Sequence, residues 1–170
     1  MKQFFLYVIS IIIFFLLQTT VFQWLSLAGV APNLLIIAAV SAGLLNGSVP
    51  GIFVGLACGL MVDCVYGSVI GLCGLFYMLA GYLAGIVNRF YSPQEEYGIP
   101  LLVIGAGDLL YNFFYYVAEF LMRNRQAFGV YFLKIMLPEM IYTLLAAVFL
   151  YKLIFWIHKK IQMGGKKEES

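Results

Sequence analysis

Long apolar runs, separated by short turn-forming or polar segments, organise this chain. A helix that crosses a membrane needs about 20 predominantly apolar residues, and somewhat fewer when it is buried among other helices. The pattern therefore predicts six transmembrane helices, of which the second is the shortest. Their approximate ranges are 4–24, 33–45, 49–66, 69–88, 99–121 and 137–156.

Proline, glycine and polar residues mark the boundaries of these helices. Pro32 stands just before the second helix, where its missing N–H does no harm. The segments Asn46-Gly47-Ser48 and Gly67-Ser68 predict breaks on either side of the third helix. The stretch 89–98 is the polar loop before the fifth helix.

The start of the last helix stays open at this level. Residues 128–136 fit an interfacial lead-in that is followed by Pro138 in the first helical turn, a routine position for proline. Glu139 then lies at the positive end of the helix, where a carboxylate is favourable. If the helix instead begins near Val130, Pro138 kinks it and frees backbone carbonyls.

Composition settles the class of protein. Of 170 residues, 64% are hydrophobic and only 11% are charged, and the mean hydropathy is +0.97. A soluble domain is about half apolar and about a quarter charged. We therefore predict an all-α membrane protein with one compact membrane domain over residues 1–158. Residues 159–170 are expected to form a disordered cytoplasmic tail.

Lysine and arginine orient the helices, because both residues are enriched in cytoplasmic loops. With the N-terminus inside, seven of them fall on the inside and three on the outside, which favours an N-in, C-in topology. The inside set is Lys2, Arg89, Lys152, Lys159, Lys160, Lys166 and Lys167, and the outside set is Arg123, Arg125 and Lys134.

A glycine ladder with a spacing of four runs along the third helix. Gly47, Gly51, Gly55 and Gly59 are followed by Asp63 as the next rung. A step of four advances about 400° around a helix, so these positions form one slowly drifting stripe. Because a glycine stripe lets another helix backbone approach closely in lipid, we predict a helix-packing seam that begins at Gly47.

Asp63 is the first of several polar side chains inside the apolar runs. It lies about fourteen residues into the third helix, towards its outer end. Keeping a carboxylate in such a run is costly, which makes it a pointer to function. Two interpretations are open. Asp63 caps the next helix across the turn at Gly67, or it is a buried contact that fixes the helix register or a partner.

The fifth helix carries a second polar group. Asp108, Asn112, Tyr115 and Glu119 follow one another at spacings of 4, 3 and 4, which places all four on one face. Glu119 is also four residues before Arg123, a spacing that permits an ion pair. Three interpretations are open. Neighbouring backbone or side chains within the bundle satisfy the hydrogen bonds of this polar stripe, or the stripe belongs to a ligand or proton pathway, or it contacts another membrane protein.

Residue types that support catalysis or metal binding do not come together in this sequence. Cys58, Cys64 and Cys73 lie in apolar segments, and His158 is the single histidine. There is no phosphate-binding loop followed by Lys, no G-x-S-x-G motif and no H-E-x-x-H motif. We therefore expect no enzymatic activity, no metal, no cofactor and no nucleic-acid partner.

Two blocks of the sequence carry a resemblance to a known family. The first comprises 17–22 (LQTTVF), with Gln18 and Thr19 near the end of the first helix, and 25–35 (LSLAGVAPNLL). The second comprises the glycines and Asp63 of 51–72, followed by 81–85 (GYLAG). Together they resemble the family of the rod shape-determining protein MreD. That family commonly has Asp where Asn33 stands here, so a carboxylate role does not carry over to this position.

The resemblance implies a function that composition does not reveal. MreD-like proteins are multi-pass proteins of the bacterial cytoplasmic membrane and belong to the elongation machinery. They bind MreC through its membrane helix, and they support cell shape and lateral peptidoglycan synthesis together with RodA, a class B penicillin-binding protein and MreB. Membrane lipids surround them, and no enzymatic activity is attributed to them. Their fold is similar to the six-helix substrate-binding subunits of energy-coupling-factor transporters.

That similarity of fold supplies the alternative function, a vitamin-binding subunit of such a transporter. Those subunits typically carry a small-x-x-x-small motif in the first helix, with which they dock on the energising subunit. The first helix here reads FFLYVISIIIFFLLQTTVF and lacks that motif. The sequence thus favours the MreD-like interpretation.

Overall fold

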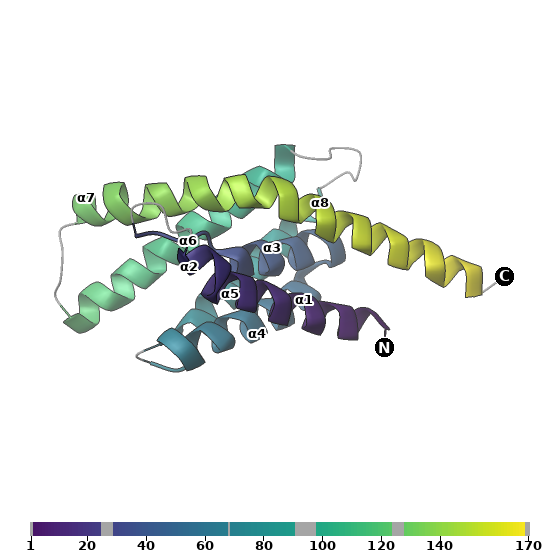
Figure 1. The fold of residues 1–170 in the computed structure, drawn as a ribbon, viewed down its shortest axis with the longest axis horizontal. Helices are drawn as coiled ribbons and strands as arrows, with labels where there is room; N and C mark the ends of the chain where they lie inside the picture. Colours follow the sequence, from purple (N-terminus) through teal and green to yellow (C-terminus); the bar gives the residue numbers. More distant parts are fainter. Residues whose placement is uncertain (1, 25–28, 68, 91–97, 124–127, 169–170) are drawn as a thin grey trace.

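The computed structural model describes residues 2–24, 29–67, 69–90, 98–123 and 128–168, and its regular elements are helices (Figure 1). One of them, η1, is a π-helical turn between two α-helices. The elements are α1 Lys2–Thr19, α2 Val21–Trp24, α3 Leu34–Asn46, α4 Ser48–Tyr66, α5 Leu72–Val87, α6 Gly98–Arg123, α7 Phe128–Tyr131, η1 Phe132–Met136 and α8 Leu137–Glu168.

The first apolar run is divided in two, whereas the sequence pattern predicted one helix over 4–24. The break falls at Thr20, between α1 and α2. The Thr19 hydroxyl donates to the Phe15 carbonyl oxygen at 2.8 Å, and the Thr20 hydroxyl donates to the Leu16 carbonyl oxygen. Threonines that bond back to the preceding turn in this way bend and weaken a helix.

The last helical segment begins at Phe128 and passes through η1 directly before Pro138. The Leu137 N–H donates to the Phe132 carbonyl, five residues back, which is the π-helical pattern. The extra residue in this turn accommodates a proline that has no N–H to donate. Of the two sequence alternatives, the helix that begins before Pro138 is therefore the one that forms.

The prediction of a disordered tail is wrong for most of its length. Helix α8 does not end near Trp156 but continues to Glu168 and extends beyond the rest of the bundle (Figure 1). Lysine, glutamine, methionine and glutamate are good helix formers, and no proline follows Trp156. Only the glycine pair 164–165 opposes the helix, at about 1 kcal/mol per glycine.

Helix α3 is the centre of the bundle. Every residue from Leu34 to Leu44 is buried, which fits a helix that is apolar all round. It contacts α1, α4, α5, α6 and α8, so the other long helices surround it. Its 13 residues extend over about 20 Å, less than the roughly 30 Å of a bilayer core. A short helix is tolerated here because protein covers it.

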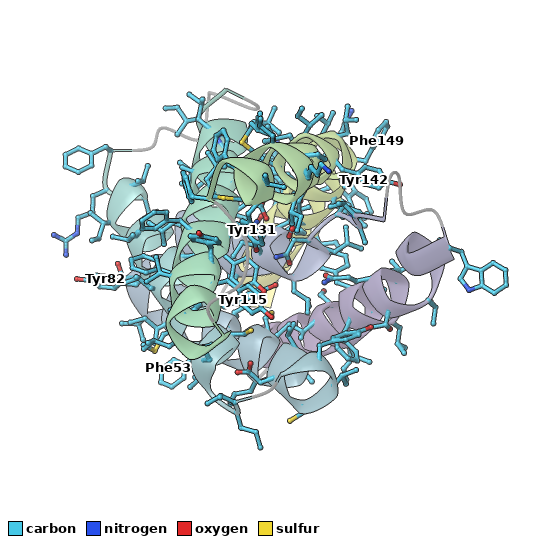
Figure 2. All side chains as sticks on the ribbon, turned by 90° about the vertical axis from the view of Figure 1, so that its left-hand side faces the viewer. Phe53, Tyr82, Tyr115, Tyr131, Tyr142 and Phe149 are labelled. Atoms are coloured by element: carbon cyan, nitrogen blue, oxygen red, sulfur yellow. The ribbon has the colours of Figure 1, made fainter. Side chains whose placement is uncertain are left out.

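Length and apolar composition make three helical segments candidates for crossing a membrane, namely Ser48–Tyr66, Gly98–Ala118 and Phe128–Lys159. Three shorter apolar helices accompany them at Val8–Thr19, Leu34–Asn46 and Leu72–Val87. Large apolar side chains also cover the outside of the bundle. Phe53 is 67% exposed and Phe149 is 79% exposed, and both point outwards in Figure 2. The fold is that of an all-α membrane protein.

Candidate functional site

Three glycines of α4 lie directly against the backbone of α5. A methyl group added at Gly51, Gly55 or Gly59 would approach the carbonyl oxygens of Gly81, Tyr77 and Cys73 to 2.3, 2.4 and 2.5 Å. Real Cβ atoms do not approach other atoms this closely. These three positions therefore require glycine because the two helix backbones touch.

The contact continues from α5 to the start of α4 and to α3. A methyl group on Gly85 would lie 2.2 Å from the Ser48 Cα atom, and one on Gly43 would lie 2.2 Å from the Gly81 carbonyl oxygen. We call Gly43, Gly51, Gly55, Gly59, Gly81 and Gly85 the glycine seam. It joins α3, α4 and α5 into a tightly packed unit around the centre of the bundle.

Gly47, the first rung of the predicted ladder, has a different role from the other rungs. A methyl group there would meet no atom within 4 Å, but its φ of +95° is one that residues with side chains rarely adopt. Gly47 forms the tight turn between α3 and α4. Gly71 plays the same part before α5, with a φ of +99°.

Asp63 accepts three backbone hydrogen bonds from the start of α5. Its Oδ2 atom accepts from the N–H groups of Gly71 at 2.9 Å and Gly74 at 3.0 Å, and its Oδ1 atom accepts from the Cys73 N–H at 3.1 Å. The first N–H groups of a helix have no partner within it and favour a negative charge. Asp63 is 2% exposed. The structure thus places it in the capping arrangement, one of the two predicted alternatives.

Two side chains from different segments cap the start of α3. The Asn33 Oδ1 atom accepts from the Ile36 N–H at 3.2 Å, and the Gln18 Oε1 atom accepts from the Leu35 N–H at 3.1 Å. Gln18 comes from α1, so its bond also attaches α1 to the central helix. The neighbouring Thr19 bonds only within its own helix in the contacts described above.

Asn33 is also the centre of a buried polar cluster that joins four helices. The Tyr77 hydroxyl on α5 donates to the Asn33 Oδ1 atom at 2.5 Å, and the Asn33 N–H donates to the Thr143 hydroxyl oxygen on α8 at 3.0 Å. The side-chain amides of Asn33 and Asn112 hydrogen-bond to the Glu139 carboxylate. Helices α3, α5, α6 and α8 are therefore connected through polar groups in the interior.

Asp108 completes this cluster and differs from its other members. Its side chain is 0% exposed, and neither carboxyl oxygen has a hydrogen-bond partner among the described residues. The Asn112 amide, one turn further along α6, donates to the backbone carbonyl of Asp108 at 3.1 Å and not to its side chain. Glu139 acts on the Asp108 carboxyl electrostatically. We call Asn33, Tyr77, Asp108, Asn112, Glu139 and Thr143 the polar cluster.

The structure describes three of the four side chains in the predicted polar stripe of α6. Asp108 and Asn112 face the bundle interior, and the Tyr115 ring is tilted against that of Tyr111 with ring centroids 5.9 Å apart. The side chain of Glu119 lies outside the described residues. Glu139, predicted as a charge at a helix start, instead meets Asn112 within the cluster because the helix begins well before Pro138.

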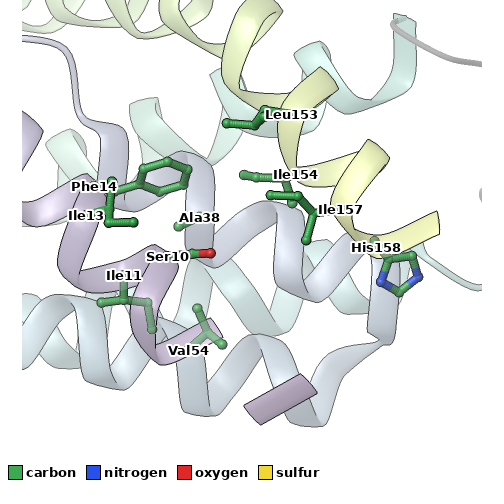
Figure 3. A pocket seen from close by; sticks show the side chains of 10 residues that line it. All are labelled: Ser10, Ile11, Ile13, Phe14, Ala38, Val54, Leu153, Ile154, Ile157 and His158. Carbon is green, nitrogen blue, oxygen red and sulfur yellow. The ribbon is translucent and has the colours of Figure 1, made fainter. Parts of the chain in front are cut away.

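A lateral cavity of about 110 Å³ opens between α1 and α8, with α3 and α4 as its floor (Figure 3). Eight of the ten residues that line it are apolar, and the polar ones are Ser10 and His158. The members of the polar cluster do not line it. Its chemistry suits hydrocarbon more than a polar small molecule.

Neither the glycine seam nor the polar cluster contains a histidine, a cysteine or a lysine. Within the described ranges no group of three His, Cys, Asp or Glu side chains could hold a metal ion. Cys58, Cys64 and Cys73 are free thiols. Both features connect helices to one another.

Sequence reasoning missed Asn33, Tyr77 and Thr143 as members of the polar cluster. A signal existed for Asn33, because asparagine after proline and before an apolar run is a typical helix N-cap. Thr143 follows Glu139 by one helical turn, which places the two on one face. Tyr77 had no signal of its own among the many aromatic residues.

Comparison with known proteins gives one family. The model of the family described as rod shape-determining protein MreD matches residues 1–161. No curated protein matches the chain, and no solved structure matches it.

Proposed function

The chain belongs to the family of the rod shape-determining protein MreD, and from this premise we propose that it is a non-enzymatic membrane scaffold of the bacterial rod complex. The family match over residues 1–161 is the observation that carries the proposal. The fold supports it, because the polar groups of the interior connect helices and the outside is apolar.

The proposed direct partner is MreC, bound through its single membrane helix. An apolar helix in lipid associates through close van der Waals packing. The glycine seam is already occupied by α3, α4 and α5 of the same chain, so the contact surface has to lie on the outer faces. Exposed apolar side chains line those faces on α4, α6 and α8, for example Phe53, Leu102 and Phe149. RodA, a class B penicillin-binding protein and MreB belong to the wider complex in this proposal.

We propose that the chain is a multi-pass protein of the cytoplasmic membrane, with six crossings and with both termini on the cytoplasmic side. Its proposed fold is like that of the substrate-binding subunits of energy-coupling-factor transporters. The six crossings are α1, α3, α4, α5, α6 and α8. Figure 1 supports an even number, because the N- and C-termini lie at the same end of the molecule. The excess of lysine and arginine predicted on the inside supports the orientation.

A vitamin-binding transporter subunit is the less favoured function. Such a subunit needs a cavity with a few polar groups that fix a polar ligand. The cavity between α1 and α8 is lined almost wholly by apolar residues, and the members of the polar cluster other than Glu139 are buried. The family match gives no support to this alternative either.

Copurification from native membranes tests the two functions against each other. We expect the tagged chain to recover MreC, with no vitamin and no ATPase module. A Gly74→Ala variant should retain MreC, because a methyl group there would lie against the ends of the flexible Leu60 and Leu56 side chains, at 3.4 and 3.5 Å. Stoichiometric bound vitamin, or recovery of an ATPase module, would overturn the proposal.

A further inference from the structure

Two carboxyl groups lie inside the polar cluster, and they are not equivalent. Glu139 receives hydrogen bonds from the side-chain amides of Asn33 and Asn112. Asp108 receives none on either oxygen from the residues that the structure describes, although its side chain is fully buried. A buried carboxylate without donors is very costly, since it loses its hydration and gains nothing in return.

The side-chain amides of the cluster donate hydrogen bonds to Glu139. The Asn33 Oδ1 atom accepts from Tyr77 and Ile36, which leaves its NH₂ group for Glu139. The Asn112 NH₂ group serves Glu139 and the backbone carbonyl of Asp108. The side-chain amides of the cluster are therefore directed to Glu139 and not to the Asp108 carboxyl group.

Among the side chains that the structure describes, no cation acts on Asp108. Glu139 on α8 is the charged group that acts on Asp108, whereas Tyr77 and Cys73 on α5 act on Tyr111, one turn further along α6. The described lysines of α8, Lys152 and Lys159, are exposed. Helix α3 has no titratable side chain, and the lysine of η1, Lys134, is exposed on the surface. Two negative charges at close range in such an interior repel each other strongly.

We propose that Asp108 and Glu139 form a proton-binding site within the polar cluster, in which the pair holds one proton on the buried Asp108 while Glu139 is the anion. The proton removes the second negative charge and turns Asp108 into an O–H donor. Loss of the proton would leave two anions on opposite sides of the contact between α6 and α8. Proton binding at this site thus holds α6 and α8 together, a role that goes beyond the scaffold function and does not depend on MreC.

Infrared spectroscopy of the whole protein in lipid nanodiscs tests the site directly. Asp63 and Asp108 are the two aspartates in the chain, so labelling aspartate with ¹³C at the side-chain carboxyl reports on these two groups alone. At neutral pH we expect a ¹³C-shifted C=O stretch of a protonated carboxyl group. Asp63→Asn is the matched control and should keep this band, because Asp63 acts as an acceptor for three N–H groups.

Asp108→Asn should remove the band completely and should leave the protein folded, because asparagine is neutral and of similar shape. If that variant does not fold, the labelled wild type and Asp63→Asn still decide the matter. A wild-type spectrum without a protonated aspartate at neutral pH would overturn the proposal. Disappearance of the band on adding sodium ions would overturn it as well, since the site would then take a metal cation.

Discussion

Single glycines determine how closely α4 and α5 pack. A leucine or even an alanine at Gly55 would collide with the backbone of the facing helix, which cannot move aside as a flexible side chain can. The same substitution at a glycine that faces side chains has a different result. Each glycine of the seam is thus required by its own backbone contact. Substitution of single glycines can distinguish these positions from glycines that face side chains.

The first prediction compares Gly55→Ala with Gly74→Ala. At Gly55 the new methyl group lies 2.4 Å from the Tyr77 carbonyl oxygen, so the helices have to separate, and we expect a loss of about 1–3 kcal/mol. At Gly74 we expect a change within about 0.5 kcal/mol. Thermal unfolding in nanodiscs measures both. Gly55→Leu should prevent the packing altogether and lower the amount of protein in the membrane. Equal melting temperatures for the two alanine variants would contradict the seam.

The second prediction concerns Asp63. Asp63→Ala leaves three N–H groups at the start of α5 without their acceptor, and we expect a loss of about 2 kcal/mol or more. Asp63→Asn keeps one acceptor oxygen, so we expect about half of that loss and normal recovery of MreC. Melting temperature and copurification measure the two effects. Normal stability of Asp63→Asn with loss of MreC would instead indicate a charge that binds the partner.

At the scale of elements, hydrogen bonds connect several helices to the start of α3. Gln18 connects α1 to it, and Asn33 connects it to α5 and α8. These bonds satisfy N–H groups that a helix leaves free, and they do so with side chains of its neighbours. The central helix is therefore held at its end by polar contacts and along its length by apolar ones.

The third prediction compares Gln18 and Asn33, the two side chains that cap the start of α3. Gln18→Ala removes one bond to α3, and we expect a loss of about 1 kcal/mol. Asn33→Ala removes the cap, leaves the Tyr77 hydroxyl without its acceptor and removes one of the two amide donors to Glu139, so the loss should exceed that of Gln18→Ala by about 1–3 kcal/mol. Chemical unfolding of the two single variants decides it. A smaller effect for Asn33→Ala would contradict the role of the polar cluster.

The elements were accessible from the sequence to different degrees. The glycine spacing on α4 is a local pattern, and it identified the face that packs at Gly51, Gly55 and Gly59. The polar cluster is not local. Asn33 is 44 residues from Tyr77 and 110 residues from Thr143, so no pattern in one sequence links them. The π-helical turn before Pro138 and the extension of α8 to Glu168 likewise depend on how one segment continues into the next.

At the scale of the whole molecule, a short helix that is buried from Leu34 to Leu44 is surrounded by longer ones with apolar outer faces. Both chain termini lie at one end (Figure 1). In a six-crossing N-in, C-in arrangement, that end faces the cytoplasm together with the lysines of α8. The opposite end then carries the starts of α3, α5 and α7.

The fourth prediction tests this arrangement. In a background without the three native cysteines, single cysteines are placed at position 92, between α5 and α6, and at position 125, between α6 and α7. We expect a membrane-impermeant maleimide to label position 125 in intact cells and position 92 only after the cells are opened. The reverse result would invert the topology. Labelling of both positions in intact cells would contradict the crossing of α6.

The central claim, that this chain is a scaffold for MreC, is tested most directly by disulfide crosslinking of its outer faces to the membrane helix of MreC. Exposed positions on three helices, Phe53, Leu102 and Phe149, are paired with the buried neighbours Val54, Ile104 and Ala147 as controls. A disulfide forms only when the Cα atoms come within about 7 Å. We expect at least one exposed position to crosslink efficiently while its buried neighbour does not. Absence of a crosslink at all three faces, with both proteins present in the membrane, would contradict the account.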